Sequence, residues 1–113
     1  MGLVAGPTTT NATLVATRVT ADLRPGTLKT ATVVCLEATV GKGEIAVLLT
    51  VERGGPGDSY AIATLIDDYV YTGHNPAWSG EIHCDTGDTL VLTYRSSVAA
   101  RLATNSSIIR RGA

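Results

Sequence analysis

Residues 81–94, EIHCDTGDTLVLTY, hold the side chains most able to do chemistry in this 113-residue chain. Eight positions supply an imidazole, a thiol and three carboxylates: Glu81, His83, Cys84, Asp85 and Asp88. These groups can bind metals or move protons. In a strand, however, His83 and Cys84 point to opposite faces, and Glu81 and Asp85 lie about 13 Å apart. A metal would need a distant ligand such as His74, so we predict no metal site.

The triplet Asp85-Thr86-Gly87 also opens the catalytic loop of aspartic proteases, and the chain length resembles that of a retroviral-type protease subunit. In such dimers each copy supplies one Asp, and the two carboxylates share a proton. Here only 26 residues follow Gly87, the preceding Ile82-His83-Cys84 is not uniformly apolar, and no apolar-apolar-Gly-Arg segment comes later. Asp before Gly is ordinary hairpin chemistry, because Asp can bond its own backbone and Gly accepts a positive φ. We therefore predict a structural turn, with no catalytic residue and no enzyme.

Turn-forming clusters separate runs of β-branched residues along the whole chain. The clusters are Arg24-Pro25-Gly26, Gly41-Lys42-Gly43, Gly54 to Asp58, Gly73 to Pro76 and Asp85 to Asp88. The runs predict strands at 12–23, 30–40, 44–53, 60–71, 78–84, 89–96 and 106–110. Apolar residues alternate at Ile45, Val47, Leu49 and Val51, and again at Leu90, Leu92 and Tyr94. The pattern predicts a mainly β fold, an antiparallel β-sandwich or barrel of about seven short strands.

Two segments leave room for a helix. Ile62, Leu65, Ile66 and Tyr69 fall at helical spacing behind a possible cap at Asp58 or Ser59. Residues 59–69 are therefore either a strand, which we favour, or an amphipathic helix. Residues 97–103 are compatible with a short helical turn. We expect at most one or two short helices.

Charge is scarce and unevenly distributed. The charged fraction is 17%, against a typical value of about 25%, and the net charge of -1 argues against nucleic acid as a partner. Residues 54–94 carry six acids and no Lys or Arg, whereas residues 95–113 carry four Arg, including Arg110 and Arg111, and no acid. This polarity, together with strands that are apolar on both faces, predicts contacts between subunits in a homo-oligomer.

The N-terminal segment predicts an arm. Residues 1–11 contain Gly2, Gly6, Pro7 and three Thr, which favour extended or irregular backbone. We expect a flexible arm at 1–11, with Leu3 and Val4 as its anchoring side chains, and a single β domain at 12–113. No secretory signal or membrane-spanning run is recognisable, so we expect synthesis in the cytoplasm and no membrane partner. Under those conditions Cys35 and Cys84 are expected to stay free thiols.

Three of the five aromatic residues fall within ten positions. They are Tyr69, Tyr71 and Trp78, and His74 lies between them beside a Gly and a Pro. Tyr and Trp anchor protein interfaces and also stack against sugar rings. We take these four residues as interface or ligand-binding candidates, with core packing as the alternative for Trp78. No cofactor is expected.

The length, the richness in Thr, Ala, Val and Gly, the apolar arm Gly2 to Thr13 and the strand-turn series through Tyr94 resemble the small virion proteins of tailed bacteriophages, particularly capsid decoration or cement proteins. The resemblance implies a structural protein of the virion that forms homo-oligomers, often trimers, and binds the major capsid protein or another virion protein. It assigns no functional residue. The alternative is a carbohydrate- or receptor-binding module, of the fibre-head type, that uses residues 69–78.

Overall fold

The computed structural model describes residues 3–12, 17–36, 39–54, 58–98 and 100–110. These residues form strands and no helix. The strands are β1 (Leu3–Ala12), β2 (Thr17–Asp22), β3 (Gly26–Cys35), β4 (Ile45–Arg53), β5 (Tyr60–Tyr69), β6 (Ala77–Cys84), β7 (Thr89–Ser96) and β8 (Ala100–Arg110). Within these ranges, nothing resembles a membrane-crossing apolar helix. The predicted all-β character is confirmed.

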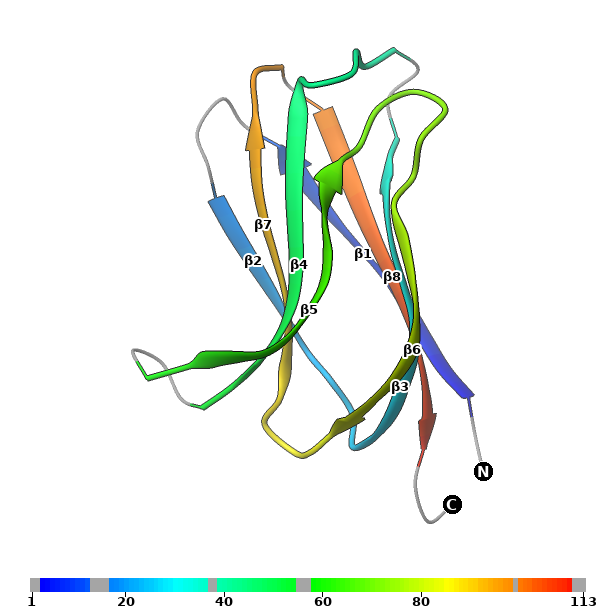
Figure 1. The fold of residues 1–113 in the computed structure, drawn as a ribbon, viewed down its shortest axis with the longest axis vertical. Helices are drawn as coiled ribbons and strands as arrows, with labels where there is room; N and C mark the ends of the chain where they lie inside the picture. Colours follow the sequence, from blue (N-terminus) through cyan, green and yellow to red (C-terminus); the bar gives the residue numbers. More distant parts are fainter. Residues whose placement is uncertain (1–2, 13–16, 37–38, 55–57, 99, 111–113) are drawn as a thin grey trace.

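Two four-stranded antiparallel sheets pack face to face (Figure 1). The first sheet has the order β1-β8-β3-β6 and the second sheet the order β2-β7-β4-β5. Consecutive strands lie in opposite sheets, except for the β4–β5 hairpin. This order is that of a jelly roll, a double-sheet architecture built from two Greek keys. The fold is therefore a sandwich, and the closed barrel that the sequence left open is not formed.

The additional strand, beyond the seven expected, comes from the predicted arm. Leu3 to Ala12 form β1, which pairs antiparallel with β8 from Leu3↔Ile109 to Ala12↔Ala100. The boundary predicted at residue 11 thus falls inside a strand, because the main chain of this segment bonds to the edge of β8. The flexibility expected for residues 1–11 stays a prediction.

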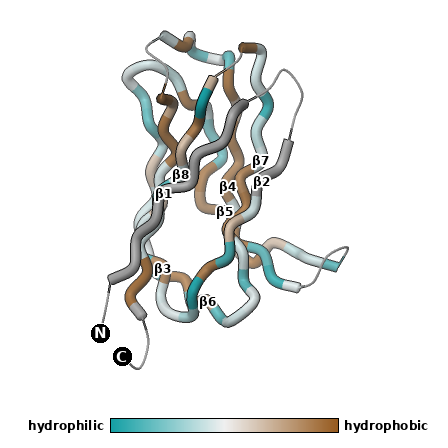
Figure 2. Tube along the Cα trace, turned by 180° about the vertical axis from the view of Figure 1, so that it is seen from behind, coloured by the Kyte–Doolittle hydropathy of each residue, from teal (hydrophilic) through white to brown (hydrophobic). Residues whose placement is uncertain are grey.

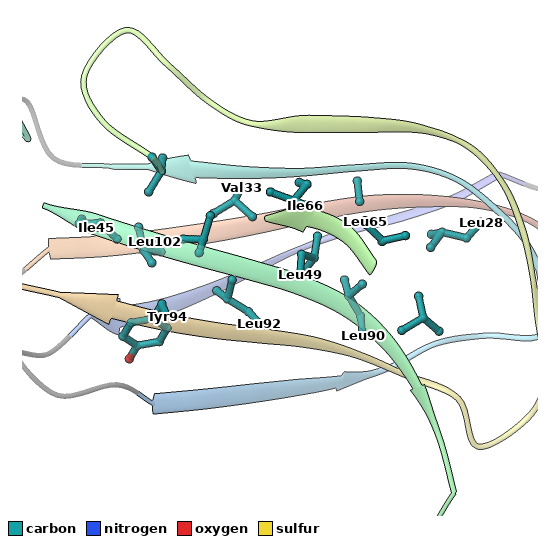
Figure 3. Packing of buried hydrophobic residues seen from close by; sticks show 14 of the residues in the cluster. Leu28, Val33, Ile45, Leu49, Leu65, Ile66, Leu90, Leu92, Tyr94 and Leu102 are labelled. Carbon is teal, nitrogen blue, oxygen red and sulfur yellow. The ribbon is translucent and has the colours of Figure 1, made fainter. Parts of the chain in front are cut away.

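The core lies between the sheets and follows the predicted alternation. Ile45, Val47, Leu49 and Val51 of β4 are all buried, and β7 buries Leu90, Leu92 and Tyr94 beside them. The first sheet contributes Leu28, Val33, Leu102 and Ile108 from the opposite side. Figure 3 shows labelled members of this set, among them Leu28, Leu49 and Leu92, between the two layers. Burial of one face of each strand fixes the register, since a shift by one residue would expose every one of these side chains.

The helical spacing on β5 has a different cause, so the helix considered at 59–69 is wrong. On β4, Leu49 pairs with Ile66 and Thr50 with Thr64, which leaves Leu65 as an extra residue of β5. A second irregularity leaves Ile62 as an extra residue between Ala63 and Ala61. Each bulge shifts the side-chain alternation by one position. Leu65 and its neighbour Ile66 can therefore both be buried.

The helical turn considered at 97–103 is also wrong. Ser96 ends β7, and the Val98 N–H donates a 3.1 Å hydrogen bond to Ser96 Oγ. After this bend β8 runs from Ala100 to Arg110. It therefore begins six residues before the strand start predicted at 106. The longer strand pairs with both β1 and β3.

The hairpin between β4 and β5 bends away from the body of the sandwich (Figure 1, lower left). β5 of this hairpin carries the two bulges, at Ile62 and Leu65, and bulges increase the local twist and bend of a strand. Figure 2 shows brown, hydrophobic stretches on the body of the sandwich and mostly white to teal colours at the end of the hairpin. The hairpin end is thus a polar projection from the second sheet.

Candidate functional site

The acidic segment around Asp85 forms the turn between β6 and β7, as predicted. The Asp88 N–H donates to the Asp85 carbonyl oxygen at 3.1 Å, and Gly87 has a φ of +94°. The carboxylate that accepts from the turn backbone belongs to Asp88 rather than to Asp85, since the Asp85 N–H donates to Asp88 Oδ2 at 2.8 Å. The side-chain bond to the turn backbone that was expected of Asp85 is therefore made by Asp88, three residues later.

Asp88 is the centre of this cluster. Its side chain is 1% exposed, and Arg53 at the end of β4 donates to both carboxylate oxygens, Nε to Oδ1 and Nη2 to Oδ2, at 2.9 Å each. These hydrogen bonds hold the pKa of Asp88 below its ordinary value, against the opposing effect of burial. The Asp88 carbonyl also accepts from the Leu23 N–H at 2.9 Å. Asp88 thus joins the β2–β3 connection, the end of β4 and the β6–β7 turn.

Asp85 and His83 lie at the solvent side of the same cluster. Arg53 Nη2 is 3.3 Å from Asp85 Oδ2, and His83 Nε2 is 3.0 Å from Asp85 Oδ1. Arg53 therefore bridges the carboxylates of Asp85 and Asp88 and links the end of β4 to the β6–β7 turn. Cys84 lies on the opposite face from His83, buried in the core, and that burial raises the pKa of its thiol. Across the described ranges, no three His, Cys, Asp or Glu side chains are grouped to hold a metal ion.

Sequence reasoning missed the role of Arg53 and Asp88. An Asp three residues after the first turn residue is a local signal, because a short carboxylate there can reach back to the turn backbone. Arg53 gives no local signal, since it is 35 positions from Asp88 in sequence. Other acids of the segment 54–94 also have basic partners: Lys29 binds Glu81 at 2.5 Å and His74 binds Asp68 at 2.9 Å. These acidic residues are therefore separated from Lys and Arg along the sequence but lie beside basic side chains in the folded structure.

The four aromatic-segment candidates do not form one platform. Tyr69 is exposed at the end of β5, and it pairs with Ala46 of β4. Trp78 is half-buried against the core, with its ring over Gly80, where an added Cβ would lie 2.7 Å from the ring. Only Tyr71 and His74 are brought together, with ring centroids 4.9 Å apart in a stacked arrangement.

The Tyr71–His74 turn is held at two points. The Thr72 N–H donates to the Val40 carbonyl, and the Val40 N–H donates to Thr72 Oγ1 at 2.8 Å. His74 Nε2 lies 2.9 Å from Asp68 Oδ2, and this bond is the main reason that the pKa of Asp68 is lowered. The segment is thus an anchored turn beside the ends of β5 and β6.

The remaining described candidates, Leu3, Val4 and Arg110, lie at the other end of the molecule. Leu3 and Val4 pair with Ile109 and Ile108 of β8, and Arg110 ends that strand opposite Gly26. The start of β1 and the end of β8 lie at the bottom of Figure 1, whereas the turn at residues 71–74 lies at the top. Arg111 lies outside the described residues. The candidates therefore form two groups at opposite ends of the sandwich.

Comparisons with known proteins concern the fold alone. No protein-family model matches the chain, and no curated protein matches it in sequence. Among solved structures, the Yersinia pseudotuberculosis-derived mitogen is 10% identical, with a TM-score of 0.47 over 96% of this chain and 86% of that chain. A chain in the structure of infectious bursal disease virus Gx strain is 12% identical, with a TM-score of 0.49 over 98% of this chain and 32% of that chain.

Proposed function

We propose that this protein is a non-enzymatic structural component of a virion, of the capsid decoration or cement type. In this role it binds copies of itself and the major capsid protein or another virion protein. The observation that carries the proposal is the placement of its exposed large hydrophobic side chains. Leu36 follows β3, Tyr60 begins β5 on the projecting hairpin, and Tyr69 ends β5.

Separate contact points suit a protein that ties neighbours together. Tyr60 and Tyr69 lie at opposite ends of one strand of the second sheet, and Leu36 follows β3 of the first sheet. Each is more than two-fifths exposed, and exposed aromatic or large apolar side chains are typical anchors of protein interfaces. The jelly-roll architecture is compatible with this role, since capsid domains use it, as do lectin domains.

The alternative, a carbohydrate- or receptor-binding module, needs its aromatic side chains at one site. The inward position of Trp78 and the separate position of Tyr69 weigh against a shared stacking platform on residues 69–78. The Asp85 cluster gives no support to catalysis, because Arg53 engages both carboxylates. Contact with other protein surfaces is the role that these observations favour.

Particles from the cells that produce this protein provide the test. They are banded on a density gradient, and the protein is quantified by mass spectrometry against the major shell protein. A decoration protein co-bands at a fixed ratio, and shells assembled without it form but open at a lower temperature. Absence from the banded particles would overturn the proposal. Glycan-array binding that Tyr71→Ala removes would favour the alternative instead.

A further inference from the structure

The outer face of the second sheet, turned away from the core, has an uncharged centre. Ala46 and Leu48 of β4 and Thr93 of β7 lie there half-buried, and Leu48 and Thr93 are direct neighbours in the register. They line a shallow hollow of about 240 Å³. A sheet face in water normally carries polar residues. An uncharged, hollowed centre is therefore suited to contact with another protein surface.

The next pair along this face is also uncharged. Thr50 and Val91 pair across β4 and β7, and both are buried although Val91 does not belong to the core cluster. Their neighbours Leu49 and Leu92 face the core, so Thr50 and Val91 must face outward. The uncharged character therefore continues along the outer side of the sheet, but Thr50 and Val91 are themselves covered, so the uncharged surface open to contact is that of Ala46, Leu48 and Thr93.

Two exposed, opposite charges flank the hollow. Asp67 stands on β5 beside Leu48, and Arg95 stands on β7 beside Ala46. The two charges lie diagonally across β4, on either side of the hollow that they help to line. Within the described ranges, neither side chain has an ion-pair partner. In this respect they differ from Asp68, Glu81, Asp85 and Asp88, which all have basic partners.

We propose that the outer face of the second sheet is a two-fold contact between two copies of the chain, with Arg95 of each copy opposite Asp67 of the other. A two-fold axis in the plane of the contact, crossing β4 between Ala46 and Leu48, forms both ion pairs at once. In a two-fold contact the same patch serves both subunits, and residue i meets j where j meets i. Two charges of opposite sign on either side of an uncharged surface meet that condition.

The same axis explains why Tyr69 is exposed at this place. Tyr69 lies beside Ala46 in the register, so the rotation brings the Tyr69 ring of one copy toward Ala46 of the other. A small residue leaves room for an aromatic ring there, and aromatic anchors with charged rims are typical of protein interfaces. A trimer would need two different patches in contact, so this face predicts a dimer in place of the expected trimer. The proposed function includes binding between copies of this chain. The two-fold contact names the surface for that binding and rests on the proposed function to that extent.

Sedimentation velocity and light scattering on the full chain test the contact, at concentrations up to about 1 mM. We expect a species of twice 11.7 kDa. Arg95→Asp and Asp67→Arg each place like charges opposite each other twice per dimer, and each should weaken the dimer about tenfold or more. Arg24→Asp, at an exposed position between β2 and β3, is the matched control and should leave the dimer unchanged. Circular dichroism confirms that each variant is folded.

An equal mixture of the two single variants is the decisive sample. In the mixed pair, the introduced carboxylate of the Arg95→Asp chain would face the introduced guanidinium of the Asp67→Arg chain. The second contact would keep its native Arg95 and Asp67. The mixture should therefore recover the dimer, as should the double variant Arg95→Asp with Asp67→Arg. A monomeric or trimeric wild type, or a mixture as weak as its components, would overturn the proposal.

Particle binding separates this inference from the proposed function. A chain that dimerises through this face and is absent from particles contradicts the virion role alone. A chain that co-bands with particles while Arg95→Asp leaves its own association unchanged contradicts this contact alone.

Discussion

Two acid–base clusters lie at the two ends of this sandwich and differ in what surrounds them. At the β6–β7 turn, the buried Asp88 receives two bonds from Arg53. At the β5–β6 connection, Asp68 receives one bond from His74, and both side chains are more than a third exposed. The donor–acceptor distance is 2.9 Å in both clusters.

Equal distances therefore conceal unequal roles. Water competes freely for the Asp68 and His74 groups, whereas the Asp88 side chain is 1% exposed and is bonded to Arg53 and to the Asp85 N–H. Asp88 also joins three separate parts of the chain: the end of β4 through Arg53, the β6–β7 turn through the Asp85 N–H, and the β2–β3 connection through Leu23. The comparison predicts that the Asp88 cluster stabilises the fold and that the Asp68 pair contributes little. The following changes test that difference.

The largest effect is expected from Asp88→Ala. The change removes the acceptor for Arg53 and for the Asp85 N–H in a place closed to water. We expect the free energy of unfolding to fall by about 3 kcal/mol. Urea unfolding followed by the fluorescence of the single tryptophan, Trp78, measures it. Asp85→Ala is the control; its carboxylate is 57% exposed, and the loss should stay below about 1 kcal/mol. Equal losses would contradict the central role of Asp88.

Acid should weaken the wild type through the same residue. The Asp88 pKa is lowered in the folded state, first by Arg53, so the unfolded chain takes up the proton more readily. The stabilisation is fully present above the unfolded value of about 3.9 and is lost as the pH falls through the folded pKa. Unfolding free energies measured between pH 6 and 2 should therefore decline below about pH 4. Asp88→Asn should make this profile flatter, and an unchanged profile would assign the acid sensitivity to other carboxylates.

The sequence predicted what local patterns determine. Alternation at Ile45 to Val51 identified the inner face of β4, since one buried face leaves a period of two. On β5 the same rule gave an ambiguous answer. Leu65 and Ile62 are extra residues without a partner on β4, and this becomes visible only once β5 is paired with β4. A bulged strand and a helix then present the same spacing of apolar residues, and the sequence alone cannot separate them.

Only half of the candidate site could be predicted, for a similar reason. The turn at Asp85 to Asp88 follows from Asp and Gly chemistry within four residues, and the φ of Gly87 agrees. The ion pairs of that turn depend on β4 ending beside it, which is a property of the strand order. The hollow between Asp67 and Arg95 likewise exists only after β5, β4 and β7 are placed side by side.

Backbone strain should affect the two clusters alike. Gly87 and Gly73 have φ values of +94° and +87°, and an added Cβ would meet nothing within 4 Å at either position. Gly87→Ala and Gly73→Ala should therefore each cost about 1 kcal/mol of unfolding free energy, from the positive φ alone. The same urea experiment measures both. A much larger loss at Gly87 would show that the β6–β7 turn depends on its backbone as well as on Asp88.

The smallest effect is expected from Asp68→Asn. The amide keeps the oxygen that accepts from the Tyr69 N–H at 2.7 Å, and it removes the charge that faces His74. Because both partners are exposed, solvent screens the lost attraction, and salt screens it further. We expect a urea midpoint within error of the wild type at both low and high salt. A clear loss at low salt that disappears at high salt would show that this exposed pair does stabilise the fold. The difference in stability between the two clusters would then come mainly from the number of elements that each one joins, and less from burial.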